Sequence, residues 1–242
     1  MVNYSEDYLL DKQIKIFQPI EGYRASTDAV LLAATMNKIC KNDRILDLGS
    51  GTGAVSLCLA SKFSDRVSEI VGVEIQPELV ELANKSAQAN GFSNLHYINA
   101  DIFASGLPFC SFNHVYTNPP YFENNMPTSP KKGKATAHTF KQKALPEWIN
   151  ICIKMIQPQG YLYMVNRAEA LDEILNCIYG KLGEITIFPI YSKDNQQAKR
   201  IVIRAKKDSK APLKIMPGLV LHEENGAYTE SAEKILRGGA SL

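Results

Sequence analysis

The sequence predicts an α/β protein with a mostly parallel sheet and helices on both of its faces. Short apolar runs, typical of buried strands, alternate along the chain with longer amphipathic runs, typical of helices. At 242 residues the chain is long enough for one domain with its own hydrophobic core. Its 27 Lys and Arg residues nearly balance its 25 Asp and Glu residues, which excludes a histone-like electrostatic binder but is compatible with a local basic patch.

The alternation predicts seven strands and the helices between them. Pro77 suits a first helical turn, Asn90-Gly91 suits a helix end, and Pro158 and Gly160 are expected to end the helix before them. The expected strands are 44–48, 68–74, 95–99, 113–117, 161–165, 184–190 and 200–205, the last two joined by a polar turn. The expected helices are 28–38, 53–63, 77–90, 145–157 and 168–181.

Two parts of the chain lie outside this alternation. Residues 1–42 form an N-terminal lead-in that we expect to pack on a central domain of residues 43–208. Residues 209–242 are expected to extend the same domain with a short strand, a turn at Asn225-Gly226 and a final helix. The polar stretch 123–143 is the only long loop, and long loops inside compact domains are commonly functional.

The cysteines, the histidines and the first ten residues limit which classes of protein fit the sequence. The five cysteines contain no CxxC pair and the four histidines are scattered, so neither a disulfide framework nor a metal site is expected. The first ten residues, MVNYSEDYLL, are acidic and polar, unlike a signal peptide, and no apolar stretch approaches the ~20 residues that cross a bilayer. We therefore expect a cytoplasmic protein without membrane association, and a monomer because no dimer seam is evident.

A glycine-rich loop follows the first strand of the central domain. Residues 45–53 read ILDLGSGTG, and Gly49, Gly51 and Gly53 allow a tight turn and close approach to a ligand. The GxGxG spacing, with Asp47 on the preceding strand, differs from the GxGxxG fingerprint of dinucleotide-binding folds. Taken alone, the loop is equally compatible with a simple strand-to-helix turn.

Carboxylates follow the next two strands. Glu74 ends the second strand, where a carboxylate can accept hydrogen bonds from both hydroxyls of a ribose. Asp101 follows the third strand, where it can accept a hydrogen bond from an exocyclic amine. Each alone could be a strand-end cap. Ligands of open α/β sheets, however, bind at the carboxyl ends of the strands, where these residues and the loop would meet.

These segments resemble the first three motifs of class I S-adenosylmethionine-dependent methyltransferases. They read DLGSGTG at 47–53, GVE at 72–74 and AD at 100–101. The resemblance implies a Rossmann-like fold and S-adenosyl-L-methionine as the cofactor. It implies that the first segment holds the methionine moiety, the second the ribose and the third the adenine amino group, through Asp47, Gly49, Gly51, Gly53, Glu74 and Asp101.

The residues NPPY at 118–121 directly follow the fourth strand and resemble the [D/N/S]-P-P-[Y/F/W] motif of amino-group methyltransferases. A conjugated amine or an amide is a poor nucleophile because its lone pair is delocalised. Hydrogen bonds from its N–H groups to the Asn118 side-chain oxygen and the Pro119 carbonyl would turn that lone pair toward the methyl donor. Tyr121 or Phe122 would offer a face for stacking a planar target. A rigid turn after a strand is the plain alternative.

The motif serves several acceptors: adenine N6, guanine N2 and the side-chain amide of glutamine in release factors. Release-factor enzymes carry a helical domain ahead of the glycine loop, and the 46 residues before Asp47 disfavour that acceptor. Residues 18–32, QPIEGYRASTDAVLL, resemble the opening signature of the bacterial tRNA adenine-N6 methyltransferases. This resemblance implies methylation of adenine 37 in the anticodon loop of a valine tRNA. Ribosomal RNA guanine N2, DNA adenine and release-factor glutamine are the alternatives, and a non-catalytic RNA binder is a further one.

Several residues are expected to contact the substrate. Ser26, Thr27 or Asp28 suits a helix N-cap, and Tyr23 and Arg24 lie in the loop before it, where they could cover the cofactor or the target base. Arg24 could equally be a solvated charge. Lysines after the NPPY motif, and basic residues of the turn 193–200 on the same rim, would neutralise RNA phosphates unless they are merely solvated. These basic residues are Lys131, Lys132, Lys134, Lys193, Lys199 and Arg200.

Overall fold

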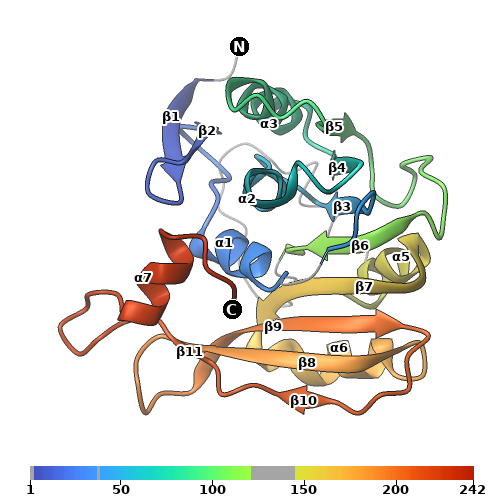
Figure 1. Ribbon diagram of the computed structural model, residues 1–242, viewed down its shortest axis with the longest axis vertical. Helices are drawn as coiled ribbons and strands as arrows, with labels where there is room; N and C mark the ends of the chain where they lie inside the picture. Colours follow the sequence, from blue (N-terminus) through green and yellow to red (C-terminus); the bar gives the residue numbers. More distant parts are fainter. Residues whose placement is uncertain (1–2, 37–38, 121–144) are drawn as a thin grey trace, which may run out of the picture.

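The computed structural model of the protein describes residues 3–36, 39–120 and 145–242, and a twisted central sheet runs through it (Figure 1). In this part of the chain the sheet has nine strands in the order β10-β8-β9-β7-β6-β3-β4-β5, with β11 paired to β8. Its strands are β3 (Arg44–Leu48), β4 (Glu69–Glu74), β5 (Leu95–Asn99), β6 (Phe112–Thr117), β7 (Ile156–Arg167), β8 (Leu182–Tyr191), β9 (Ala198–Lys207), β10 (Lys214–Ile215) and β11 (Leu219–Val220).

The sheet confirms the mostly parallel architecture. Strands β3 to β7 pair in parallel, whereas β9 is antiparallel to both β7 and β8. All seven predicted strands are present, and the two-residue strands β10 and β11 extend the edge beyond β8, where the sequence predicts a single short strand. Because β8 runs in the same direction as β7, the turn between β8 and β9 lies at the carboxyl edge of the parallel strands.

Helices cover both faces, and each face has its own core cluster. One cluster includes α1 (Thr27–Ala34), α2 (Ala54–Phe63), α3 (Pro77–Ala89) and α7 (Glu230–Leu236); the other includes α5 (Leu145–Met155) and α6 (Leu171–Ile178). The helix predicted over 168–181 begins as a 3₁₀ turn, Ala168–Ala170, before α6. Within the described residues no helix is both long and apolar enough to cross a bilayer.

The end of α5 differs from the prediction. Strand β7 follows α5 directly, so Pro158 and Gly160 lie inside a strand and do not end the helix. The register between β6 and β7 shifts after the Phe112–Ile156 pair, so the proline sits in an irregular segment where its missing N–H costs no ladder bond. A Cβ at Gly160 would lie 2.7 Å from the Asn113 carbonyl oxygen, which explains the glycine in this segment.

The lead-in contains a β-hairpin that the sequence analysis does not predict. Strands β1 (Tyr4–Leu9) and β2 (Ile14–Pro19) pair antiparallel and pack beside α3 (Figure 1). Ser86 of α3 and its C-cap Asn90 bind the backbone of β2: Ser86 Oγ accepts from Phe17 N–H at 2.9 Å, and Asn90 Oδ1 accepts from Lys15 N–H at 2.9 Å. The connection contains three left-handed residues, 10–12, but neither glycine nor asparagine, so the usual turn signal is missing.

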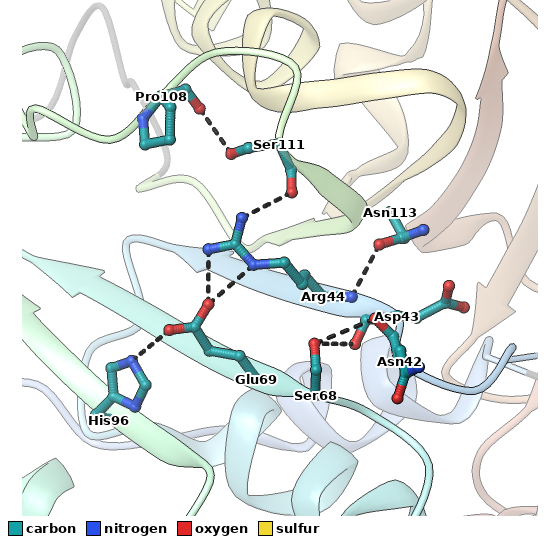
Figure 2. A network of polar contacts seen from close by, with 9 residues as sticks. All are labelled: Asn42, Asp43, Arg44, Ser68, Glu69, His96, Pro108, Ser111 and Asn113. Atoms are coloured by element: carbon teal, nitrogen blue, oxygen red, sulfur yellow. Dashed lines mark hydrogen bonds and ion pairs between the residues drawn. The ribbon is translucent and has the colours of Figure 1, made fainter.

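A polar network ties the strands together at the amino edge of the sheet, opposite the glycine loop (Figure 2). Arg44 on β3 donates from Nε and Nη2 to Glu69 Oε2 on β4, at 2.9 and 2.6 Å. His96 on β5 lies 2.9 Å from the other oxygen of the same carboxylate, and Arg44 Nη1 donates to the Ser111 carbonyl at 3.1 Å. The network therefore links β3, β4 and β5 with the residue before β6.

We expect Glu69→Gln to lower the free energy of unfolding by about 1 kcal/mol at pH 7. Burial alone would raise the pKa of Glu69, but the hydrogen bonds and charge of Arg44 and the bond from His96 outweigh it and hold the pKa below 4.5. The Arg44–Glu69 pair therefore stabilises the fold above pH 4.5. This stabilisation is lost as the pH falls through the lower pKa that Glu69 has in the folded protein. Urea unfolding at pH 7 and pH 3.5 measures this. An equal difference between wild type and variant at both pH values would contradict the assignment.

Candidate active site

A cavity of about 460 Å³ lies at the carboxyl edge of the parallel strands. This volume is in the range of small-molecule and cofactor sites. The loop before α1, the glycine loop, the ends of β4 to β6 and helix α5 all contribute to its wall. It brings together nine of the residues that the sequence predicts for the site: Tyr23, Arg24, Gly49, Gly51, Glu74, Asp101, Asn118, Pro119 and Arg200.

Other predicted residues lie elsewhere. Asp47 and Gly53 are buried and do not line the cavity. Lys193 lies in the β8–β9 turn at the same edge, and its Nζ donates to the Glu224 carbonyl at 2.8 Å. Strand β9 begins at Ala198, so Lys199 lies at the start of this strand and not in the predicted turn. The predicted stacking residues and loop lysines lie outside the described residues: Tyr121, Phe122, Lys131, Lys132 and Lys134.

The glycine loop is held open by backbone conformation and by two aromatic rings. Gly49, Gly51 and Gly53 have φ values of +72°, +56° and +84°, which side chains rarely tolerate. A Cβ at Gly49 would lie 2.9 Å from Trp148 Cζ2, and a Cβ at Gly51 would lie 2.5 Å from Tyr23 Cε1. The loop therefore needs glycine both for its turn and for its contacts, and its bare backbone faces the cavity.

Glu74 and Asp101 present carboxylates to this cavity. Glu74 is buried, and its oxygens accept hydrogen bonds from the Gly51 N–H at 3.0 Å and the Gln76 N–H at 2.9 Å. Asp101 Oδ1 accepts from the Phe103 N–H at 2.9 Å. Glu74 Oε1 also accepts from Gln76 Nε2 at 3.4 Å, whereas Oε2 can accept a second hydrogen bond. Two fixed acceptors beside a bare glycine loop fit the hydroxyls and exocyclic amine of a nucleoside cofactor.

Asn118 and Pro119 also line the cavity, directly after β6. The preceding residue, Thr117, is buried; its Oγ1 donates to the Leu48 carbonyl at 2.9 Å and accepts from Trp148 Nε1 at 2.8 Å. These bonds attach the beginning of the NPP segment to the end of β3 and to α5. The segment is therefore held at a set distance from the glycine loop.

Sequence reasoning missed Trp148. It is the only tryptophan of the chain, it lines the cavity and it is 3% exposed. Within its helix it follows the same apolar spacing as the core residues Leu145, Ile149 and Cys152. No local signal separates it from them. Ser26, the N-cap of α1, and Asp28 also line the cavity and were predicted only as capping residues.

The two arginines in the wall have partners within the protein. Arg24 donates to Asp7 Oδ2 at 2.7 Å, to Ser5 Oγ at 2.9 Å and to the Pro19 carbonyl at 3.0 Å, so it is not simply a solvated charge. Arg200 Nε donates to Asp28 Oδ2 at 3.2 Å. Contact of either residue with a substrate stays a prediction. Among the described residues no group of three His, Cys, Asp or Glu side chains could hold a metal ion.

A family described as "Methyltransferase domain" matches residues 39–209. The chain belongs to this methyltransferase family. The match confirms the predicted enzyme class, the class I α/β fold and S-adenosyl-L-methionine as the methyl donor. A crystal structure from Agrobacterium tumefaciens, described as a predicted O-methyltransferase, has the same fold with a TM-score of 0.73 and 25% identity, covering 89% of this chain and 98% of that one.

Curated relatives are similar over different lengths. The tRNA1(Val) (adenine(37)-N6)-methyltransferase of Porphyromonas gingivalis is 30% identical over 67% of this chain and 66% of its own length. The enzyme of the same name from Pedobacter heparinus is 26% identical over 93% of this chain and 94% of its own. The release factor glutamine methyltransferase of Escherichia coli is 43% identical, but over 35% of this chain and 29% of its own length.

Asp47 lies at the end of β3, two residues before the glycine loop, and binds the first turn of α2. Its Oδ2 accepts from Ser56 Oγ at 2.9 Å and from Ser56 N–H at 3.3 Å, and the same hydroxyl lies 3.0 Å from the Tyr97 hydroxyl. Burial raises the pKa of Asp47 to about 7, although the two hydrogen bonds from Ser56 oppose the rise. Ionisation of this buried carboxyl therefore destabilises the folded protein.

We expect Asp47→Asn to raise the melting temperature of the ligand-free protein at pH 8 by roughly 2–4 °C. Because the folded-state pKa lies above the ordinary value of 3.8, the carboxyl stabilises the fold less and less as the pH rises from 3.8 through about 7. The amide oxygen of asparagine can still accept from Ser56. Thermal unfolding at pH 4.5 and pH 8 measures the effect, with Asp65→Asn as control because its side chain is 78% exposed. A variant less stable than wild type at pH 8 would show that the carboxylate is needed in its ionised form.

Proposed function

We propose that this methyltransferase transfers the methyl group to the exocyclic N6 of an adenine in tRNA, adenine 37 in the anticodon loop of a valine tRNA. The observation that carries the proposal is a single cavity with Asn118 and Pro119 on one part of its wall and Glu74 and Asp101 on another. Relatives that are named for this reaction and match 93% of the chain support the same acceptor. The match to a release-factor enzyme covers 35% of the chain and supports it less.

Asn118 and Pro119 would hold the nitrogen that is methylated. The Asn118 side-chain oxygen and the Pro119 carbonyl accept hydrogen bonds from its two N–H groups, which turns the lone pair out of conjugation with the ring. Two successive prolines restrict the backbone and so set the direction of that carbonyl. The nitrogen becomes acidic once it is alkylated and gives its proton to water. The reaction therefore needs no side chain with a strongly altered pKa.

The carboxylates and the glycine loop would hold the cofactor, which supplies an electrophilic methyl group on a sulfonium. Glu74 accepts hydrogen bonds from the ribose hydroxyls, and Asp101 accepts from the adenine amino group. The backbone of Gly49 and Gly51 leaves space for the methionine moiety. Asp47 and Gly53 do not line the cavity; Asp47 binds Ser56 and Gly53 is the N-cap of α2, so both would act by fixing how the loop enters this helix.

The proposed acceptor is accessible without opening a duplex. A base in an anticodon loop is single-stranded, so turning it out into a pocket costs little compared with opening a duplex pair. Lys193 in the β8–β9 turn, and Lys199 and Arg200 at the start of β9, would contact phosphates near the cavity, together with the loop lysines predicted from the sequence. We further propose that the protein acts as a cytoplasmic monomer, with residues 43–208 as the catalytic domain, the lead-in 1–42 packed on it and residues 209–242 as its extension.

We expect Asn118→Ala to reduce methyl transfer at least 100-fold, because one of two acceptors on the reacting amine is lost. The assay transfers labelled methyl groups from S-adenosyl-L-methionine to bulk tRNA from cells that lack this protein, followed by nucleoside digestion. Labelled N6-methyladenosine is the expected product. Asn150→Ala is the matched control, because Asn150 is exposed on α5 and binds Lys181 at 2.8 Å.

Two results would contradict the proposal. Label in ribosomal RNA, DNA or release factors with none in tRNA would refute the acceptor but not the family. Full activity of Asn118→Ala would refute the role given to the NPPY motif. Loss of RNA affinity in this variant, with no turnover measurable even in wild type, would instead indicate an RNA-binding protein without catalysis.

A further inference from the structure

Tyr23 forms a wall of the cavity that comes from outside the central domain. Its ring lies directly on the glycine loop, since a Cβ at Gly51 would meet ring atoms at 2.5 and 2.9 Å. Gly51 is also the residue whose N–H binds Glu74, at 3.0 Å. Tyr23 lines the cavity and is 44% exposed, so its side chain contacts both the cavity and solvent.

The segment that carries Tyr23 has no regular secondary structure between β2 and α1 and is held by side chains. Arg24 binds Asp7 and Ser5 of β1 and the Pro19 carbonyl at the end of β2. At the next residue, the Ala25 N–H donates to Gln18 Oε1 of β2 at 2.7 Å. Both residues that follow Tyr23 are therefore attached to the hairpin.

Asp7 is the centre of this attachment. Its Oδ2 accepts from Ser5 Oγ at 2.7 Å, Gln18 Nε2 at 3.1 Å and Arg24 Nη2 at 2.7 Å. Burial alone would raise the pKa of Asp7, but the hydrogen bonds from Ser5 and Gln18 and the charge of Arg24 outweigh it and keep the pKa below 3.8. The carboxylate is therefore ionised at neutral pH and orders the two groups that bracket Tyr23.

The hairpin is in turn attached to the body of the protein. Ser86 of α3 and Asn90, the C-cap of this helix, bind the hairpin backbone. Helix α3 begins at Pro77, three residues after Glu74 at the cavity. A continuous set of contacts thus runs from α3 through the hairpin to Tyr23.

We propose that Asp7 and Arg24 are positioning residues that hold Tyr23 against Gly51, and that the Tyr23 ring thereby retains the bound cofactor. The inference rests on the cofactor site of the proposed function and is independent of the methyl acceptor. The lead-in is then part of the cofactor site: without the hairpin contacts, the Tyr23 ring loses its place on the glycine loop and the cavity opens to solvent at this end.

Glu6 provides a matched control on the same strand. It pairs with Lys15 at 3.0 Å and accepts from the Tyr8 hydroxyl at 2.6 Å, and none of these contacts reaches residues 20–25. Asp7→Asn and Glu6→Gln each remove one carboxylate and one ion pair from β1. A general loss of hairpin stability would affect both variants alike, whereas loss of Tyr23 positioning would affect Asp7→Asn alone.

The test is the affinity of the full-length protein for S-adenosyl-L-homocysteine, measured without RNA through the fluorescence of Trp148, which lines the same cavity. We expect Tyr23→Ala to raise the dissociation constant about tenfold. Tyr23→Phe should recover most of that loss. Asp7→Asn and Arg24→Gln should each raise the constant roughly three- to fivefold, and Glu6→Gln should leave it unchanged.

A double-mutant cycle separates positioning from a merely structural role. If Asp7 acts through Tyr23, Asp7→Asn adds no further loss in the Tyr23→Ala background. The proposal is overturned if the two losses add in full, if Glu6→Gln weakens binding as much as Asp7→Asn, or if Tyr23→Ala binds as tightly as wild type. Because no RNA is present, these outcomes do not depend on whether tRNA is the substrate.

Discussion

The buried hydrogen bond from the Gly51 N–H to the Glu74 carboxylate is the interaction on which the site depends. A carboxylate as buried as Glu74 is stable only when its oxygens have donors, and the donors here are the backbone N–H groups of Gly51 and Gln76 and the Gln76 side-chain amide. The same bond holds the glycine loop against the end of β4. The contact that satisfies the carboxylate in the fold therefore also shapes the cavity in which it can bind a ribose.

Strand β3 lies between the strand that leads to Glu74, proposed to bind the cofactor, and the strand that leads to Asn118, proposed to bind the acceptor. It pairs in parallel with β4 on one side and β6 on the other, so the strand ends that carry Glu74 and Asn118 emerge on either side of the glycine loop. Thr117 reinforces this arrangement through its bonds to the Leu48 carbonyl and the Trp148 indole. The residues proposed to hold the cofactor and the motif proposed to hold the acceptor thus lie at one edge of the sheet.

Local signals predicted most of the central domain. Strands β3 and β5 have the predicted bounds, 44–48 and 95–99, because each is a short apolar run flanked by turn residues. The same reasoning failed where pairing overrode local preference. Residues 10–12 make a hairpin turn without glycine or asparagine, and Pro158 and Gly160 lie in the irregular start of β7 because the register with β6 shifts there.

The sequence by itself determined the parallel α/β class, the edge of the sheet that carries the site and the chemistry of its residues. Those signals lie within short segments, and parallel pairing brings the ends of successive strands together without further information. Only the tertiary structure decided that Trp148 and Tyr23 pack against the glycine loop and that Arg24 pairs with Asp7. These are contacts between side chains of different elements, and they depend on how helices and a hairpin dock onto the sheet, which periodicity and motif spacing do not encode.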